Sequence, residues 1–161
     1  MSSLGEALAG RLVGWRGLGA IDEAALRAEL GELERDPVVR PRGARGFQVL
    51  RAGEVEAWFP GGSETAATVE FAPAADLDGE ELLADLGEPE LVLDSNHFAV
   101  GAVVSDYVYA ARGITVSVAQ PFEDGARSVV YVQLYAPTTT QAYVTEIGQS
   151  GEQIQPYPRS D

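Results

Sequence analysis

The chain has 161 residues, of which 25 are acidic and 11 basic, so its formal net charge at pH 7 is −14. It contains no cysteine, which excludes a disulfide framework, a thiolate zinc site and a cysteine nucleophile. Its length is that of one domain, or of two small units that share a core. The apolar runs are too short to span a bilayer, and the first residues lack the pattern of a signal peptide, so we expect a cytoplasmic protein.

The negative charge is concentrated in the middle of the chain. Residues 1–51 carry a net charge of +1, residues 52–111 a net charge of −13 with no basic residue, and residues 112–161 a net charge of −2. Such an anionic block repels nucleic acid and acidic membranes and attracts basic proteins. The alternative is that the acidic residues only keep the protein in solution.

The first half of the chain predicts two helices followed by strands. Leu4, Leu8 and Leu12 form a helical stripe within the first fifteen residues. Asp22 is placed to cap a second short helix, which Gly31 would end. A loop rich in Pro, Gly and Arg follows at residues 35–46. The predicted strands of this half are residues 47–52, 54–59 and 67–72.

The second half repeats this order. Asp78 is placed to cap a helix, and Glu81 three residues later completes a capping-box pattern. Gly87 would close the helix, and Pro89 prevents its continuation. The predicted strands of this half are residues 106–111, 113–119, 129–135 and 141–147.

The two halves match residue by residue around their helices. At an offset of 56, Asp22, Leu26, Leu30, Gly31 and Glu32 correspond to Asp78, Leu82, Leu86, Gly87 and Glu88. Further on, Phe71-Ala72-Pro73 corresponds to Tyr135-Ala136-Pro137. We interpret this as an internal duplication. The predicted fold is α+β, with two tandem helix-plus-antiparallel-sheet repeats in one domain and the helices on one face of the sheet. The N-terminal helix and the first repeat span residues 1–75, the second repeat spans 76–147, and 148–161 form a flexible tail.

The motif of the second half also resembles a known family. Its helix ending LGEPE, followed by DYVYAARGITVSV and VVYVQLY, is similar to the small outer-membrane lipoproteins of the BamE (SmpA/OmlA) type. Two such units in tandem resemble the β-lactamase inhibitor proteins. The chain departs from both families, because it has neither the lipobox cysteine nor the disulfides. The resemblance implies a tandem scaffold with a broad sheet that binds other proteins, and it implies no further site residues.

Alternation along the strands predicts one aliphatic face and one aromatic, acidic face of the sheet. We expect the aliphatic side chains to pack on the helices and the other face to be displayed. Exposed Tyr and Trp among carboxylates suit a partner rich in Arg and Lys. The alternative is that the N-terminal helix or the long loops cover this face, so that its aromatic side chains are ordinary core. The predicted partner-binding residues are Trp58, Tyr107, Tyr109, Tyr131, Tyr135, Glu54, Glu56 and Glu70.

Three short segments resemble catalytic or ligand sites, and each has a simpler explanation. DSNHF (94–98) holds the single histidine, His97, near Asp94, but Asp, Ser and Asn are common in turns. DLDGEELLAD (76–85) lacks the first ligand of a calcium loop, and helix capping accounts for its acids. The Arg residues of RPRGAR (40–45) could grip phosphate, but they are more simply explained as a solvated turn or as partners of the acidic block.

These observations favour a protein-binding module rather than an enzyme. We expect an inhibitor or immunity-type protein that occludes a basic partner with the acidic, aromatic sheet face, and we expect no cofactor or metal. One alternative is a self-associating assembly accessory protein that forms a homodimer. A remote alternative is an enzyme that uses Asp94 and His97.

Overall fold

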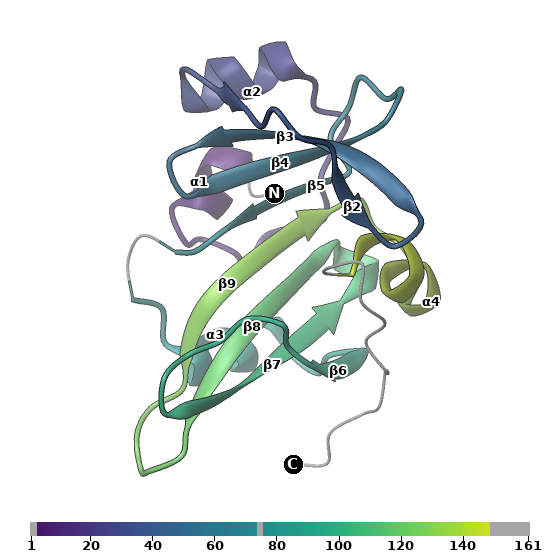
Figure 1. Ribbon diagram of the computed structural model, residues 1–161. Helices are drawn as coiled ribbons and strands as arrows, with labels where there is room; N and C mark the ends of the chain where they lie inside the picture. The colour runs from purple at the N-terminus through teal and green to yellow at the C-terminus, as the bar shows by residue number, and fades with distance from the viewer. Residues whose placement is uncertain (1–2, 74–75, 149–161) are drawn as a thin grey trace.

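The computed structural model describes residues 3–73 and 76–148, which include nine strands joined in one antiparallel sheet with α1, α2 and α3 on one side of it (Figure 1). The fold is therefore mixed α+β, as predicted. The strands are β1 (Glu34–Arg35), β2 (Arg40–Arg42), β3 (Arg45–Ala52), β4 (Val55–Pro60), β5 (Thr68–Phe71), β6 (Leu91–Asp94), β7 (Ala102–Tyr109), β8 (Ile114–Pro121) and β9 (Ser128–Tyr135). The predicted tail lies outside the described residues from position 149 onward.

The strand order is β1-β3-β4-β5-β9-β8-β7-β6, and β2 pairs with β3 beside this path. Six of the seven predicted strands are confirmed as β3, β4, β5, β7, β8 and β9, with shifts of a few residues at their ends. The sequence patterns missed β1, β2 and β6, which are two to four residues long. Strands this short give too few positions for an alternation to be recognised.

The helices α1 (Leu4–Leu8), α2 (Glu23–Leu30) and α3 (Gly79–Leu86) begin and end where local sequence directs. The Asp22 carboxylate accepts a hydrogen bond from the Ala25 amide at 2.9 Å, and Asp78 likewise caps α3. Gly31 and Gly87 end the two longer helices with φ angles of 83° and 86°, a region that favours glycine. Among the described residues, no helix is long and apolar enough to cross a membrane.

The segment after α1 ties the N-terminus to the far half of the sheet. The Trp15 indole donates a hydrogen bond to the Gly113 carbonyl at 3.0 Å, and the Leu18 amide donates to the Tyr135 carbonyl at 2.9 Å. The Arg112 guanidinium donates to the Val13 carbonyl. Leu12, predicted to be helical, lies after the helix but is fully buried. This segment therefore contributes to the core without regular structure.

The main core lies between the helices and one side of the sheet, here called the helical face. Leu26 of α2 and Leu82 of α3 pack there against strand residues from both halves of the chain. The strand residues of the helical face include Leu50, Ala57, Val69, Phe71, Ile114, Val116, Val132 and Leu134. As predicted, one aliphatic side of the sheet packs on the helices.

The predicted orientation of β7 is wrong. Tyr107 pairs with Val116 and Tyr109 with Ile114, so both tyrosines lie on the helical face. Val108, expected on the helical face, lies on the opposite side in a second apolar cluster. Both sides of β7 are buried, and in that setting hydrophobicity no longer distinguishes the two faces.

The predicted strand at 141–147 is also wrong. These residues form α4 (Thr140–Ala142) and a single π-helical turn, η2 (Tyr143–Ile147). Thr139 caps the segment by accepting a hydrogen bond from the Ala142 amide. The Tyr143 side chain is buried against the sheet, beside Tyr135. The segment lies against the side of the sheet opposite α1–α3 (Figure 1).

Candidate protein-binding surface

The eight residues predicted to contact a partner are divided between the two sides of the sheet. Tyr107 and Tyr109 lie on the helical face, and Glu54 is exposed in the turn before β4. The other five lie on the opposite side, here called the polar face. The polar and aromatic strand residues of the polar face include Glu56, Trp58, Thr68, Glu70, Asp106, Thr115, Ser117, Tyr131, Gln133 and Tyr135.

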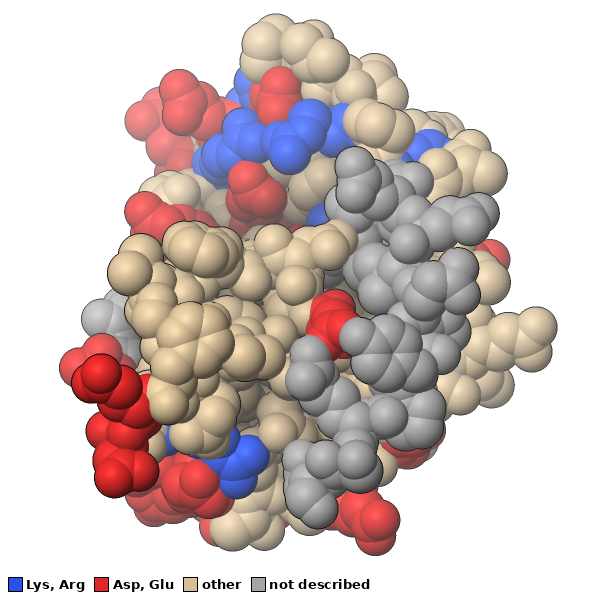
Figure 2. Space-filling model, turned by 60° about the horizontal axis from the view of Figure 1, so that its bottom comes forward, with Lys and Arg blue, Asp and Glu red and all other residues tan. Residues whose placement is uncertain are grey.

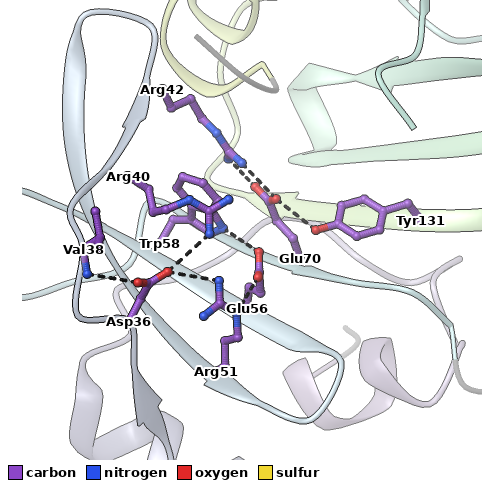
Figure 3. Close-up of polar contacts among 9 residues, drawn as sticks. All are labelled: Asp36, Val38, Arg40, Arg42, Arg51, Glu56, Trp58, Glu70 and Tyr131. Carbon is purple, nitrogen blue, oxygen red and sulfur yellow. Dashed lines mark hydrogen bonds and ion pairs between the residues drawn. The ribbon is translucent and has the colours of Figure 1, made fainter. Parts of the chain in front are cut away.

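A buried ion pair lies at the centre of the polar face (Figure 3). Both terminal nitrogens of the Arg42 guanidinium donate to the Glu70 carboxylate, and the side chains are 5% and 2% exposed. Glu70 also accepts hydrogen bonds from Thr68, Gln133 and Tyr131. Burial raises the pKa of Glu70, but the Arg42 charge and these hydrogen bonds outweigh it and hold the pKa below its ordinary value.

The loop between β1 and β3, which includes the short strand β2 and carries Arg42, covers the first half of the polar face. The Arg42 guanidinium stacks on the Trp58 ring at 3.7 Å, and that of Arg40 lies 5.2 Å from the same ring. Arg40 and Arg51 both pair with the Asp36 carboxylate (Figure 3). The prediction that arginines of RPRGAR pair with the acidic block is confirmed for Arg42, whose partner is Glu70. Arg40 pairs with Asp36, which lies outside that block.

The second half of the polar face is covered by the β6–β7 loop and by η2. The His97 ring lies 3.9 Å from the Tyr131 ring, and the Tyr143 hydroxyl donates to the Gln133 side chain at 2.7 Å. Beneath them the Ser117 hydroxyl donates to the buried Asp106 carboxylate at 2.6 Å. These contacts order a polar layer between the sheet and the segments that cross it.

The expectation that this face displays its aromatic side chains is therefore wrong. Trp58 is 5% exposed and Tyr135 is 0% exposed, and Tyr131 is half-buried beneath His97. On the helical face, Tyr107 and Tyr109 are 8% and 2% exposed. The loops supply the covering that the sequence left open as an alternative. Trp58, Tyr107, Tyr109 and Tyr135 can contact a partner only if these elements move.

The pKa values of Asp106 and Glu70 should be shifted in opposite directions from their ordinary values. Burial raises the pKa of Asp106 above 3.8, against the hydrogen bonds from Ser117 and Ser95, whereas the pKa of Glu70 lies below 4.5. As pH rises above 3.8, the stability contributed by Asp106 falls, because the folded state holds its proton longer. As pH falls below 4.5, the contribution of Glu70 is lost. Carboxyl-carbon NMR titration of the two residues measures both midpoints, and shifts of the same sign would contradict the two environments.

The serine side chains near His97 take part in a turn contact and in a carboxylate contact. The His97 backbone amide donates a hydrogen bond to the Ser95 hydroxyl at 3.0 Å, which is a turn contact. The buried Ser117 hydroxyl bonds to the Asp106 carboxylate rather than to an imidazole. In a Ser-His-Asp triad the imidazole lies between these two groups. In the described ranges, no group of three His, Asp or Glu side chains lies close enough to hold a metal ion.

Exposed apolar side chains occur instead on two neighbouring loops at one end of the sheet. Phe98 and Val100 in the β6–β7 loop are 84% and 90% exposed, and Phe122 after β8 is 71% exposed. The Phe122 amide donates a hydrogen bond to the Gly101 carbonyl at 2.9 Å, which joins the two loops. Phe98, Val100 and Phe122 are here called the tip surface. The strand and helix patterns of the sequence do not indicate these residues, although an aromatic residue inside a turn segment, as in QPFEDG, is a usable signal.

The tip surface lies in an acidic environment. Glu123 and Asp124 directly follow Phe122 and are exposed. Figure 2, which brings the bottom of the molecule forward, shows a broad area of uncharged residues with acidic side chains along its margin. In the same view, arginine side chains gather at the top, and a smaller group lies at the lower edge of the uncharged area. An apolar centre with an acidic margin is an arrangement that suits a basic protein partner.

Comparisons with known proteins give no relative for this chain. No protein-family model, no curated protein and no solved structure matches it.

Proposed function

We propose that this protein is a protein-binding module whose primary contact is the tip surface. The observation that carries this proposal is the exposure of Phe98, Val100 and Phe122, each above 70%. Among the described residues, most of the other aromatic side chains are buried in the apolar clusters, and Tyr131 is half-buried. Large apolar side chains gathered on an exposed surface are typical of interaction sites, and aromatic residues dominate binding energy there.

The charge supports a basic partner. The net charge is −14, and Glu123 and Asp124 lie beside the tip surface. An acidic field steers a basic protein toward the surface and speeds association, whereas buried aromatic anchors slow release. The proposal includes the inhibitor or immunity-type role, in which the bound module occludes a site on a basic enzyme or toxin. It also includes the cytoplasmic location expected from the sequence.

We also propose that the chain is a tandem duplication, in line with the resemblance to two BamE-like units. The strand order is symmetric about the β5–β9 pair. Asp22 bridges to Thr65, and Asp78 bridges to Ser128, so each helix cap pairs with the segment entering the last strand of its half. The carbonyls of Ile21 and Leu77, again 56 residues apart, accept equivalent hydrogen bonds. In this arrangement the β6–β7 loop is the counterpart of the loop that carries Arg42.

A second candidate function rests on the same exposure. Two copies could cover each other's tip surfaces, which would make the protein a self-associating assembly accessory. The acidic margin opposes this pairing, because Glu123 and Asp124 of each copy would approach those of the other. Raising the salt concentration should then strengthen self-association, whereas it should weaken binding to a basic partner.

Photo-crosslinking from the tip surface tests the proposal. With p-benzoylphenylalanine in place of Phe98, irradiation of the native host cells should give one dominant adduct with a basic protein. The same group at Glu88, an exposed position after α3, is the control and should not give this adduct. An adduct between two copies of the chain would instead support self-association. Equal adducts from both positions would exclude the tip surface as the contact.

Binding of the crosslinked partner should depend on the aromatic side chains of the tip surface. The double substitution Phe98→Ser and Phe122→Ser should weaken binding by about 2 kcal/mol or more, because two anchors are lost. Both side chains are exposed, so the free energy of unfolding should change by less than about 0.5 kcal/mol. Calorimetric titration and urea unfolding measure the two effects. A large loss of stability would mean that these side chains are structural.

A further inference from the structure

A groove of ≈ 530 Å³ runs between the segment after α1 and the helix α3. This volume is within the range of about 300–1,000 Å³ that ligand sites occupy. Its walls and floor are Gly10, Arg11, Leu12, Val13 and Gly14 on one side and Asp76, Leu77, Asp78, Glu81, Leu82 and Asp85 on the other. Neither the polar face nor the tip surface contributes to it.

The floor of the groove is apolar. Leu12 and Leu82 are buried in the main core, and Leu77 between them is half-buried. Val13 is 47% exposed, so an apolar side chain at the edge of the groove has no cover. Gly10 lies close to Leu77 at the groove, because a side-chain carbon on Gly10 would lie 3.1 Å from a Leu77 methyl group. An apolar group of a ligand would therefore find a bounded apolar floor.

The rim of the groove is acidic. Asp76, Asp78, Glu81 and Asp85 are all exposed, and within residues 3–73 and 76–148 none of them takes part in an ion pair. Arg11, the one cation among the described residues that line the groove, already lies 3.7 Å from Glu6. The charge of the rim is thus available to an incoming cation, and it is set beside an uncovered apolar floor.

We propose that this groove binds a segment of the partner protein in which an apolar side chain is flanked by Arg or Lys. The apolar side chain would cover Leu77 and Val13, and the cations would pair with Glu81 and Asp85. This inference rests on the proposed function, since it names the chemistry of the partner. The start of α3 is joined to the strand after the tip surface, because the Gly79 amide donates to the Arg127 carbonyl at 2.9 Å.

A peptide-binding experiment tests the groove directly. The probe is a fluorescent peptide of about twelve residues with Leu at helical spacing and Arg between, and the readout is fluorescence anisotropy with the full chain. Replacing Glu81 by Gln and Asp85 by Asn together should raise the Kd at least about tenfold, because two charge-assisted contacts are lost. The matched control replaces Glu32 and Glu88 by Gln, which removes the same charge from exposed positions outside the groove. The control should change the Kd less than about twofold.

Two further outcomes decide between specific docking and general attraction. A peptide with Ser in place of each Leu should bind at least about tenfold more weakly, since the apolar floor then has no ligand group. Equal binding of the Leu and Ser peptides, or equal losses in the groove and control variants, would overturn the proposal and leave only surface electrostatics. The substitutions at Phe98 and Phe122 should leave peptide binding unchanged. Failure of the groove and failure of the tip surface are therefore separate results.

Discussion

Replacing Arg42 by Met should lower the free energy of unfolding by about 3–5 kcal/mol, because the substitution leaves the Glu70 carboxylate buried without its cation. Arg42 and Glu70 are 4% and 1% exposed, so water cannot replace the lost partner. Three neutral donors remain around Glu70, but they do not neutralise its charge. The stacking of the guanidinium on Trp58 is lost as well. Urea unfolding at neutral pH measures the effect.

The matching change at Glu70 and the double substitution separate the ion pair from general packing. Glu70→Met alone should cost a similar amount, since it leaves Arg42 buried and unpaired. The double variant should be more stable than the sum of the two losses predicts, because apolar residues can replace a buried pair at little cost. The double variant should recover only part of the lost stability, since Gln133 and Thr68 lose the carboxylate that accepts their hydrogen bonds. A coupling energy near zero in this cycle would show that the pair contributes nothing of its own.

Arg40→Met is the control for this cycle. Arg40 lies on the same short strand as Arg42 and also approaches the Trp58 ring, but its side chain is 41% exposed. Exposed ion pairs contribute about 0–1 kcal/mol. The two arginines differ mainly in burial, so a tenfold or greater difference in their effects on the folding equilibrium is expected. Equal effects would mean that the loss of stability comes from disruption of the whole loop and not from loss of the buried ion pair.

The sequence predicted the features that depend on neighbouring residues. Asp22 and Asp78 cap helices, and Gly31 and Gly87 end them, because capping and left-handed backbone depend on a few adjacent positions. The central strands could also be predicted from the sequence, since each is a run of eight or fewer residues of high β-propensity between turn-forming residues. The antiparallel sheet followed from these strands and from the short connections between them.

The parts that failed depend on contacts between distant residues. Both faces of β7 are buried, so Tyr107 and Val108 are both compatible with a core, and only the pairing with Val116 decides which faces the helices. The segment around Tyr143 alternates like a strand, but both edges of β9 are already paired with β5 and β8. It folds as helical turns on the polar face instead. Its hydrogen bond to Gln133 joins residues that sequence patterning cannot relate.

The predicted contact residues failed for the same reason. Glu and Thr among aromatic residues indicated an exposed face, because buried carboxylates are rare. Here Glu70 is buried beside a cation that comes from a loop 28 residues earlier. The exposure of Phe98 and Phe122 also follows from the loop arrangement. Their position between turn-forming residues is nevertheless a sequence signal that they lie in exposed loops. Composition predicts that a partner would be basic, and the fold determines which side chains are exposed.

Replacing Gly113 by Ala should be more damaging than the same change at Gly53, although both residues have a positive φ angle, 68° and 60°. At Gly53 a side-chain carbon meets nothing within 4 Å, so Gly53→Ala should cost about 1–2 kcal/mol for the left-handed backbone alone. At Gly113 the same carbon would lie 2.0 Å from the Tyr135 carbonyl oxygen and 3.0 Å from the Gly17 Cα. Overpacking of this kind adds about 1–3 kcal/mol or more.

The contact at Gly113 cannot relax without breaking other bonds. The Tyr135 amide donates to the Gly113 carbonyl at 2.9 Å, and the Trp15 indole donates to the same carbonyl at 3.0 Å. The Tyr135 carbonyl in turn accepts from the Leu18 amide. Moving any one of these groups loosens the segment that joins the N-terminus to β9. Gly113→Ala should therefore lower the unfolding free energy by about 2–5 kcal/mol in total, and it should also speed hydrogen exchange at the Leu18 amide. Urea unfolding together with amide exchange checks both, and a loss no larger than that of Gly53→Ala would mean that the three segments are not closely packed in solution.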